Sequence, residues 1–241
     1  MKRIAIVVTA VAMVATPLAD LGSTLRVTLA NVVVCGLFLI SYVSARAAWG
    51  ARANLAAGLV VACGLVVEII GSRSGFPFGS YDYTDVLDPQ VAGVPIAVAL
   101  AWFAMALPAR EVALSIVGRS TPVVVRVMLG AVALTAWDVF LDPHMVMEGY
   151  WVWPEGGDYF GIPLSNFAGW LLVSAVMMTI LEVVLAPKAP QRTPVVQYVA
   201  VAAMETIGFA FFFGEPWVAL WGAVTMGLLG AVAMKRMGRV S

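Results

Sequence analysis

The strongest constraint on this chain is its succession of long, nearly uninterrupted apolar segments. Of the 241 residues, 62% are hydrophobic and 12% are charged, and the mean hydropathy is +0.95, which is typical of a membrane protein. A bilayer is spanned by about 20 apolar residues in a helix, and only helices or closed barrels satisfy their backbone in lipid. The alternating pattern of barrel strands is absent from the sequence. We therefore predict an all-α, polytopic transmembrane bundle that forms a single integral membrane domain over residues 1–241.

Eight spans are expected, with seven as the alternative. The first segment follows Met1-Lys2-Arg3 and also has the pattern of a secretory signal peptide, so whether it is retained stays open. The fourth segment is short and is predicted to end at Pro108. The predicted spans are residues 4–20, 25–43, 53–71, 93–108, 122–141, 163–186, 194–213 and 216–234.

Lysine and arginine are concentrated in alternate loops. By the positive-inside rule these loops and both termini are predicted to be cytoplasmic, in a multi-pass protein of the cell (plasma) membrane surrounded by membrane lipids. The residues concerned are Lys2, Arg3, Arg46, Arg52, Arg110, Arg119, Lys188, Arg192, Lys235, Arg236 and Arg239. The formal net charge is zero, and nothing in the sequence suggests a nucleic-acid partner.

The two long outer loops, residues 72–92 and 142–162, share a pattern. Each is preceded by an acid at the outer end of a helix, Glu68 or Asp138. Each is followed by Gly-(Val/Ile)-Pro and by a tryptophan seven residues after the proline: Gly93-Val94-Pro95 with Trp102, and Gly161-Ile162-Pro163 with Trp170. This favours a parallel helix–loop–helix repeat. The alternative is that such prolines commonly begin helices and that tryptophan favours membrane interfaces.

Three acids, Glu68, Asp138 and Glu205, lie within apolar segments toward the outer side. A charged group at the centre of a spanning helix costs at least about 2.5–3.5 kcal/mol, so such groups usually face an interior and mark function. The alternative is a structural role as buried acids bonded to polar partners. A fourth acid, Glu182, is near the cytoplasmic end of its span and is interpreted as an interfacial acid close to Lys188.

Further polar and aromatic residues are expected around these acids. Asp142 follows Asp138 by four residues and would share its helix face, and Asn166 is a polar residue early in a span. A carboxylic acid in an apolar site can stay protonated and act as a general acid, and aromatic ring faces can stabilise a cation. The alternative for the aromatic residues is a membrane-interface belt. Those expected near the acids are Phe78, Tyr81, Tyr83, Trp102, Trp137, Trp151, Trp153 and Trp170.

The residues available in this sequence argue against several kinds of chemistry. One histidine, His144, is too few for a histidine-ligated iron enzyme, and the lysines all lie at predicted cytoplasmic borders, which excludes a retinal Schiff base. The acidic loop residues Asp82, Asp85 and Asp88 are interpreted as solvated. No nucleotide-binding glycine motif is present. We therefore expect neither a metal site nor a cofactor.

Two multi-residue motifs carry a resemblance to a known family. The first is Gly75-Phe76-Pro77-Phe78-Gly79 with Tyr81 and Tyr83; the second runs from Trp137 to Pro143 and continues with Trp151-Val152-Trp153 and Asn166-Phe167-Ala168-Gly169-Trp170. Over residues 65–215 the chain resembles the carotenoid hydratase family of integral membrane proteins. The resemblance implies addition of water to the terminal C=C of an acyclic carotenoid end, giving a tertiary alcohol without a metal or redox cofactor. It also implies a substrate from the bilayer that enters sideways between helices, and other carotenoid-pathway membrane enzymes as partners.

This reaction needs a proton donor, a site that tolerates a tertiary cation, and one water. We assign Asp138 as the donor and Glu68 and Glu205 to water activation or charge balance, with Asp142 and Asn166 as orienting groups, although the roles of the three acids are interchangeable at this stage. One alternative is acid-catalysed cyclisation or isomerisation of the same polyene end. Two others are a proton-coupled lipid or solute carrier and a carotenoid-binding partner without catalysis.

Overall fold

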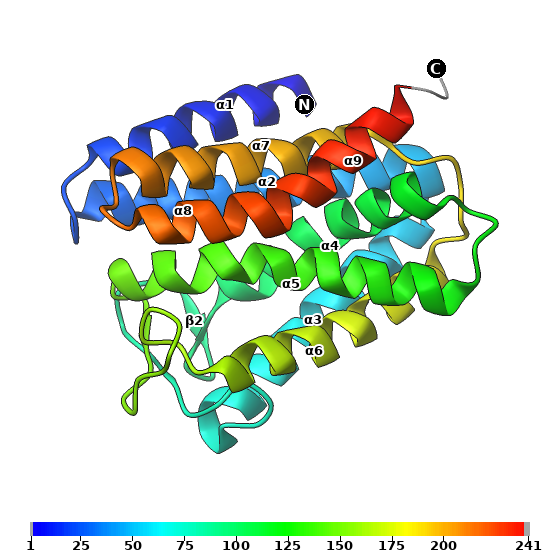
Figure 1. The fold of residues 1–241 in the computed structure, drawn as a ribbon. Coiled ribbons are helices and arrows are strands. Elements are labelled where there is room, and N and C mark those ends of the chain that lie inside the picture. Colours follow the sequence, from blue (N-terminus) through cyan, green and yellow to red (C-terminus); the bar gives the residue numbers. More distant parts are fainter. Residues whose placement is uncertain (1, 239–241) are drawn as a thin grey trace.

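The computed structural model describes residues 2–238, which form a bundle of roughly parallel and antiparallel helices (Figure 1). Seven of the helices are long and apolar enough to cross a membrane, and this confirms the predicted all-α polytopic bundle. They are α2 (Thr24–Trp49), α3 (Arg52–Ser74), α4 (Ile96–Val117), α5 (Val123–Met147), α6 (Leu164–Val184), α7 (Arg192–Phe211) and a last span, Pro216–Met237. That last span combines α8 (Pro216–Gly222), a π-helical turn (Ala223–Gly227) and α9 (Leu228–Met237). The predicted cytoplasmic residue Arg239 lies outside the described residues.

The first of the eight predicted spans is shorter than the others. Helix α1 (Lys2–Ala15) has 14 residues and is followed by a 3-10 turn, η1 (Thr16–Leu18). It packs against α2 (Figure 1). Lys2 Nζ donates to Thr193 Oγ1 at 2.8 Å, which ties the start of α1 to the start of α7. The described part of the chain therefore has seven helices of spanning length and one shorter apolar helix.

Helix α4 does not end at Pro108, as the sequence suggested, but continues to Val117. Proline lacks an N–H, so the carbonyl of Ala104, four residues earlier, loses its helical donor. That carbonyl instead accepts hydrogen bonds from Ser41 Oγ at 2.9 Å and from Gln197 Nε2 at 2.8 Å. Side chains from α2 and α7 therefore satisfy the freed backbone group, and the helix can pass through the proline.

Helix α5 passes through Pro143 for the same reason. The carbonyl freed by this proline belongs to Val139, and it accepts a hydrogen bond from the Tyr159 hydroxyl at 3.0 Å. The predicted span ended at residue 141, but the helix runs on to Met147. As a result, Asp138 and Asp142 lie on one continuous helix.

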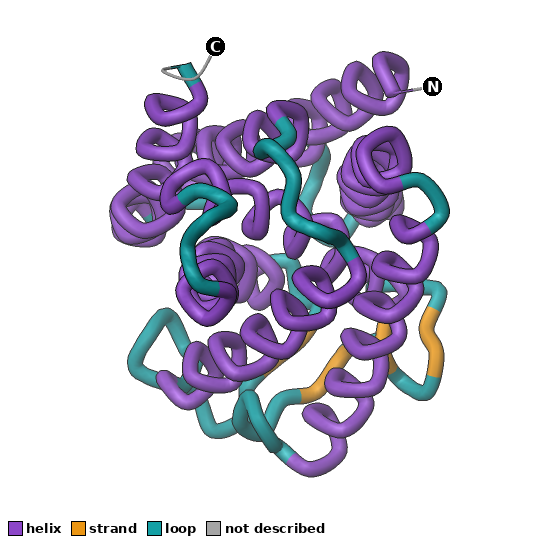
Figure 2. Tube along the Cα trace, turned by 90° about the vertical axis from the view of Figure 1, so that its right-hand side faces the viewer, coloured by secondary structure: helices purple, strands orange, loops and turns teal. Residues whose placement is uncertain are grey.

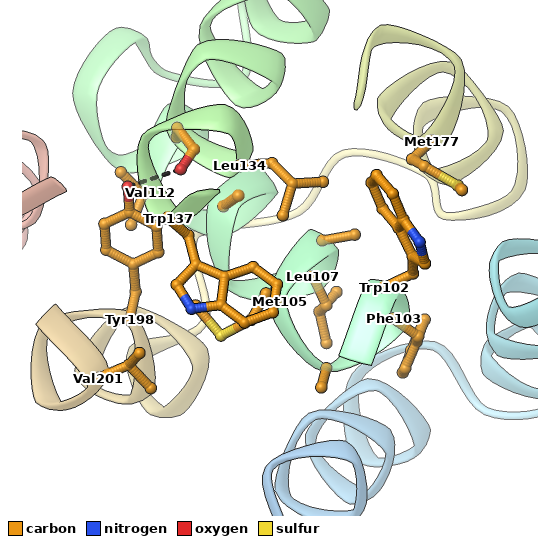
Figure 3. Packing of buried hydrophobic residues seen from close by; sticks show 14 of the residues in the cluster. Trp102, Phe103, Met105, Leu107, Val112, Leu134, Trp137, Met177, Tyr198 and Val201 are labelled. Atoms are coloured by element: carbon orange, nitrogen blue, oxygen red, sulfur yellow. Dashed lines mark hydrogen bonds between the residues drawn. The ribbon is translucent and has the colours of Figure 1, made fainter. Parts of the chain in front are cut away.

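The core is organised around α4, which is the most deeply buried of the seven helices of spanning length. Its side chains Trp102, Phe103, Met105 and Leu107 are buried among residues of α5, α6 and α7 (Figure 3). Figure 2 shows the bundle turned by 90°, with several of its helices seen nearly end-on. The aromatic and aliphatic packing thus holds the polar groups of α3, α5 and α6 at fixed positions.

Short strands join the two outer loops. Strand β1 (Asp82–Tyr83) pairs antiparallel with β4 (Trp151–Val152), placing Tyr83 opposite Trp151. Strand β2 (Gln90–Val91) pairs with β3 (Val94–Pro95) directly before α4. Backbone hydrogen bonds therefore join loops that are distant in the sequence and hold their aromatic residues at the outer end of the bundle.

The connections into α4 and α6 have matching backbones. Ala92 and Gly93 have φ angles of +55° and +87°, and Phe160 and Gly161 have φ angles of +50° and +85°. Each pair forms the tip of a two-residue hairpin turn, closed by Val91 opposite Val94 or by Tyr159 opposite Ile162. The proline that follows each turn, Pro95 or Pro163, stands directly before the first residue of its helix. This agreement supports the predicted parallel helix–loop–helix repeat.

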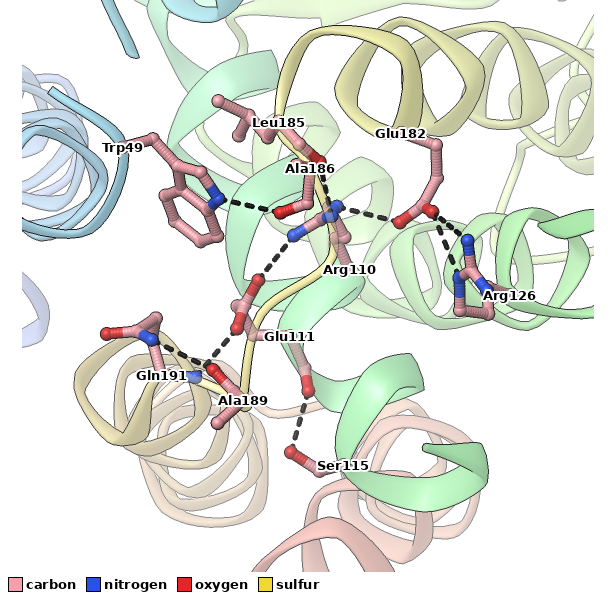
Figure 4. A network of polar contacts seen from close by, with 10 residues as sticks. All are labelled: Trp49, Arg110, Glu111, Ser115, Arg126, Glu182, Leu185, Ala186, Ala189 and Gln191. Atoms are coloured by element: carbon pink, nitrogen blue, oxygen red, sulfur yellow. Dashed lines mark hydrogen bonds and ion pairs between the residues drawn. The ribbon is translucent and has the colours of Figure 1, made fainter. Parts of the chain in front are cut away.

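A buried network of charges ties α4, α5 and α6 together at the opposite end (Figure 4). Arg110, expected in a loop, lies inside α4 and is 2% exposed. It forms ion pairs with Glu111 at 2.8 Å and with Glu182 at 2.9 Å. Glu182 also pairs with Arg126 at 2.6 Å. The prediction that Glu182 is an interfacial acid beside Lys188 is therefore wrong, because its charge is balanced by two arginines within the bundle.

Replacement of Glu182 should destabilise the fold. In Glu182→Gln, Arg126 loses its carboxylate and Arg110 keeps only Glu111, and removing one partner from a buried ion pair costs about 3–5 kcal/mol. We expect a clear fall in the thermal unfolding midpoint of the detergent-solubilised protein. Lys188→Gln is the control, because Lys188 is exposed and such substitutions usually change stability by less than about 0.5 kcal/mol. Equal midpoints for the two variants would contradict the structural role of this network.

Candidate active site

Two buried carboxyl groups on α5 share one amide donor on α6. Asn166 Nδ2 donates to Asp138 Oδ2 at 2.9 Å and makes a shorter hydrogen bond to Asp142 Oδ2. All three residues are almost fully buried. The expectation that the two aspartates share a helix face is confirmed, and Asn166 holds their carboxyl groups close together.

The third acid, Glu68 on α3, is held by three donors. The hydroxyl groups of Tyr81 and Tyr83 donate to its Oε2 at 2.5 and 2.8 Å, and Trp102 Nε1 donates to its Oε1 at 3.0 Å. Both tyrosines lie in the outer loop. Burial raises the pKa of each phenol far above its ordinary value, and the adjacent Glu68 carboxylate raises it further. The phenols therefore keep their protons and act as donors to Glu68.

A small chamber lies between these acids, with a volume of about 30 Å³. A cavity needs about 10–15 Å³ to hold one water molecule, so the chamber has room for a water but not for a carotenoid end. Of the thirteen predicted site residues, eleven line it: Glu68, Phe78, Tyr81, Tyr83, Trp102, Trp137, Asp142, Trp151, Trp153, Asn166 and Trp170. Asp138 lies directly behind this lining, where it is bonded to Asn166.

Tryptophans from the two repeated units meet at the chamber. Trp102 and Trp170 stack with their ring centroids 4.3 Å apart and an interplanar angle of 22°, and Trp137 meets Trp170 edge to face at 6.0 Å. Gly64 allows the close approach of α3, because a Cβ there would lie 2.5 Å from Cδ1 of Trp102. The chamber walls are thus largely aromatic, and aromatic faces attract cations.

One polar atom at the chamber, Trp153 Nε1, is buried without a hydrogen-bond partner among the described residues. The indole of Trp151 hydrogen-bonds to the Asp142 carboxyl group, and the carboxyl groups of Asp138 and Asp142 hydrogen-bond to each other. Buried polar groups in folded proteins are nearly always hydrogen-bonded, so the Trp153 indole calls for an explanation. A water molecule or hydroxyl group in the chamber would supply an acceptor for this indole. Within residues 2–238, no three His, Cys, Asp or Glu side chains are grouped as a metal site would require.

A second and larger cavity adjoins the chamber. Its volume is about 400 Å³, and its lining is mostly aliphatic and aromatic. The two cavities share the wall residues Val98, Ala101, Trp137, Leu141 and Trp151. A thin layer of side chains therefore separates the polar chamber from a wide apolar space.

Comparison with known proteins identifies the family. The sequence model described as "Carotenoid biosynthesis protein" matches residues 23–234, which is most of the chain. The chain belongs to this family. It is also 31% identical over 133 residues to the bisanhydrobacterioruberin hydratase of Haloarcula japonica. That alignment covers 54% of this chain and 45% of the relative, so the matched region is about half the length of the curated protein. No solved structure matches the chain.

The family and the seven apolar helices together establish a multi-pass membrane protein of carotenoid biosynthesis. The resemblance expected from the two sequence motifs is thereby confirmed. All the motif residues assigned to the site lie in or directly behind the chamber walls.

Glu205 belongs to a polar cluster that is separate from the chamber. It does not line the chamber but lines the larger cavity, where its Oε2 lies 3.2 Å from His144 Nδ1. On the other side of the ring, His144 Nε2 lies 3.6 Å from Glu148 Oε1. Glu148 in turn is bound by Arg26, with nitrogen–oxygen distances of 2.6 to 2.9 Å. The structure thus brings Glu68, Asp138 and Asp142 together and places Glu205 apart from them.

Sequence reasoning did not identify this Arg26–Glu148–His144–Glu205 cluster. Two signals were present: Arg26 departs from the cytoplasmic placement of arginines, and His144 is the one histidine of the chain. Burial raises the pKa of Glu148, but the hydrogen bonds from His144 and Arg26 more than offset this, so the pKa lies below its ordinary value of 4.5. Glu148 is therefore ionised at neutral pH and pairs with Arg26 as a carboxylate.

Removal of Arg26 should destabilise the outer half of the bundle. In Arg26→Met the Glu148 carboxylate stays buried without its guanidinium, a change that costs about 3–5 kcal/mol at buried pairs. We expect a lower thermal midpoint for this variant and partial recovery when Glu148→Leu is added. Arg73→Met is the control, because Arg73 also lies on the outer side but is exposed. The pair's contribution should be full above pH 4.5 and fall as pH drops through the lowered Glu148 pKa. Equal midpoints for Arg26→Met and Arg73→Met would contradict this role.

Proposed function

We propose that this protein is an enzyme that adds water to the terminal C=C of an acyclic carotenoid end group, giving a tertiary alcohol. The observation that carries the proposal is a buried aspartate pair beside a water-sized chamber with aromatic walls. The name of the Haloarcula japonica relative supports the same reaction class.

The proposed reaction begins with proton transfer to carbon. A carboxyl O–H bond breaks, a C–H bond forms at the less substituted alkene carbon, and a tertiary cation is left on its neighbour. Asp138 and Asp142 suit this step, because two adjacent buried carboxyl groups cannot both be ionised at low cost and no Lys or Arg of the described chain pairs with either. We assign Asp138 as the source of the proton and Asp142, which lines the chamber and shares Asn166 with Asp138, as the group through which the proton reaches the alkene.

Water then captures the cation. Its oxygen forms the new C–O bond, and one of its protons passes to the aspartate that gave up the first, so the acid is regenerated without a cofactor. The unpaired indole N–H group of Trp153 would hold this water. Glu68, fixed by its three donors, would stabilise positive charge from the far side of the chamber. Glu205 lies too far from this group to act in the chamber, and we propose instead that its pairing with His144 positions the wall of the larger cavity.

Cyclisation or isomerisation of the same polyene end remains the alternative reaction, since it shares the first protonation. A water-sized chamber with a free indole donor favours capture by water over capture by carbon. A proton-coupled carrier would need a polar path across the whole bilayer, whereas the acids at the cytoplasmic end pair with Arg110 and Arg126. Association with other carotenoid-pathway membrane enzymes stays a prediction.

Loss of the aspartate protons should abolish product. Asp138→Asn keeps the shape and the hydrogen-bonding capacity but cannot donate a carboxylic proton, and a positioned acid is typically worth about 10²–10⁴-fold in rate. We expect a fall of this size for Asp138→Asn and for Asp142→Asn, and a severe fall for Glu68→Gln. Product is measured by mass spectrometry, as the gain of one water by the carotenoids of a lycopene-producing host, and is divided by the amount of membrane-inserted protein.

The matched control is Glu155→Gln, which changes an exposed acid of the outer loop. It should retain full turnover. Near-normal product from both Asp138→Asn and Glu68→Gln would refute acid catalysis at this chamber, and a product of unchanged mass from the unmodified protein would favour the cyclase or isomerase. If Asp142→Asn is the more damaging of the two aspartate changes, the donor is Asp142. Purified protein treated with a chelator should remain active.

We also propose that the protein lies in the cell membrane with both termini cytoplasmic, as the distribution of lysine and arginine predicts. A reporter fused after Ser241, outside the described residues, and a reporter inserted at Gly156 in the outer loop should report opposite compartments. The Gly156 site is chosen because it lies between strand β4 and helix α6. The same compartment for both reporters would refute this orientation.

A further inference from the structure

The larger cavity has the size and the lining of a ligand site. Its volume of about 400 Å³ falls within the range of about 300–1,000 Å³ that is usual for small-molecule pockets. Helices α1, α2, α4, α5 and α7 and the turn η1 all contribute to its walls. The titratable groups that line it are Tyr150, His144, Glu148 and Glu205, and the last three form a chain of contacts with Arg26. The cavity therefore presents a mainly apolar surface to an occupant.

One side of this cavity opens between η1 and the outer end of α7. Four of its lining residues are also well exposed on the molecular surface: Val14 at 54%, Leu18 at 68%, Ile207 at 46% and Phe212 at 52%. All four are apolar. Val14 and Leu18 lie on α1 and η1, and Ile207 and Phe212 lie at the outer end of α7, where the bilayer would surround them. The rim of the opening is thus suited to contact with lipid chains rather than with water.

The two sides of this opening are only loosely joined. Among the described residues, one hydrogen bond connects α1 or η1 to α7, the one between Lys2 and Thr193 at the far end of these helices. Within residues 2–238, no hydrogen bond or ion pair joins the outer halves of these elements, so no polar contact has to break there when the opening widens. In Figure 1, α1 lies along the edge of the bundle beside α7 and α2.

The other side of the cavity ends at the chamber. The side chains of Trp137, Leu141 and Trp151 line both the larger cavity and the chamber. A chain that lies in the cavity with its end against Trp137 and Leu141 therefore brings its last carbons next to the chamber that contains Asp142. The remainder of a long chain would extend through the opening into the bilayer.

We propose that this cavity binds the terminal isoprenoid segment of an acyclic polyene, which enters from the bilayer through the opening between η1 and α7. This inference rests on the proposed function for its substrate class, but it concerns binding and can be tested without turnover. It assigns a binding role to α2 and to the short helix α1, which contribute no acid to the chamber.

The test uses the Asp138→Asn protein in lipid nanodiscs with lycopene as the polyene. Lycopene is achiral, so a visible circular dichroism signal that saturates with protein reports its capture in a chiral site. We expect such a signal, and we expect Val34→Trp, which places a large ring in the cavity from α2, to weaken binding by at least about tenfold, a loss of about 1.4 kcal/mol. The added ring occupies existing space, so the fold should be retained. Ala30→Trp, from the same wall, should have the same effect.

The matched control is Leu39→Trp, on the same helix but exposed and away from the cavity. It should bind lycopene as the Asp138→Asn parent does. The absence of a saturable signal in the parent, or unchanged binding in both cavity-filled variants, would overturn the proposal. Because every variant carries the inactive background, saturable binding that is lost on filling the cavity supports this inference even if the active protein fails to add water to lycopene. Failure of the active protein to add water to lycopene would refute only the proposed function and not this inference.

Discussion

The rest of this structure depends on one constraint, the absence of water at membrane depth. Every buried polar group must find its partner within the protein, because an unsatisfied group in hydrocarbon is costly. The carbonyl that Pro108 releases is satisfied by Ser41 and Gln197, and the one that Pro143 releases is satisfied by Tyr159. Since these donors come from other helices and from a loop, they also fix where α4 and α5 lie. The helices that carry Trp102 and the aspartate pair are thus positioned by the contacts that satisfy the carbonyls freed at their prolines.

The repeated helix–loop–helix unit explains why the site lies where it does. Both units place an acid near the outer end of one helix and a tryptophan two turns into the next, and the two tryptophans stack at the contact between the units. The acids have diverged in their partners. Glu68 is fixed by three donors, whereas Asp138 shares one amide donor with a second carboxyl group, Asp142. One unit therefore supplies a rigid acceptor, and the other supplies a carboxyl pair able to exchange a proton.

Much of this arrangement could be predicted from the sequence. The features that could not be predicted share one cause. The spans, the depth of Glu68 and Asp138, and the residues around the chamber followed from hydropathy, helical spacing and the two motifs. The direction in which Glu205 points did not, because α7 is apolar on most of its surface and its pattern does not show which side meets α4 and which meets α2 or the last span. Its partner is His144, 61 residues away. The continuation of α4 past Pro108 and the pairing of Glu182 with Arg110 also depend on contacts between helices that are distant in the sequence.

The two adjoining cavities suggest how a reaction with one water can proceed inside a bilayer. A tertiary cation is consumed by any nucleophile within reach, so selectivity requires that the site admit one water and no more. The chamber meets this requirement by its size, and its tyrosines and Glu68 are already bonded to one another and offer no competing nucleophile. The apolar cavity has the opposite property, since it has room for a hydrocarbon and few free polar groups to hold water. The wall of Trp137 and Leu141 is the boundary at which these two environments meet, and the reacting double bond would have to lie there. Aromatic rings at this boundary can face the cation without adding to it.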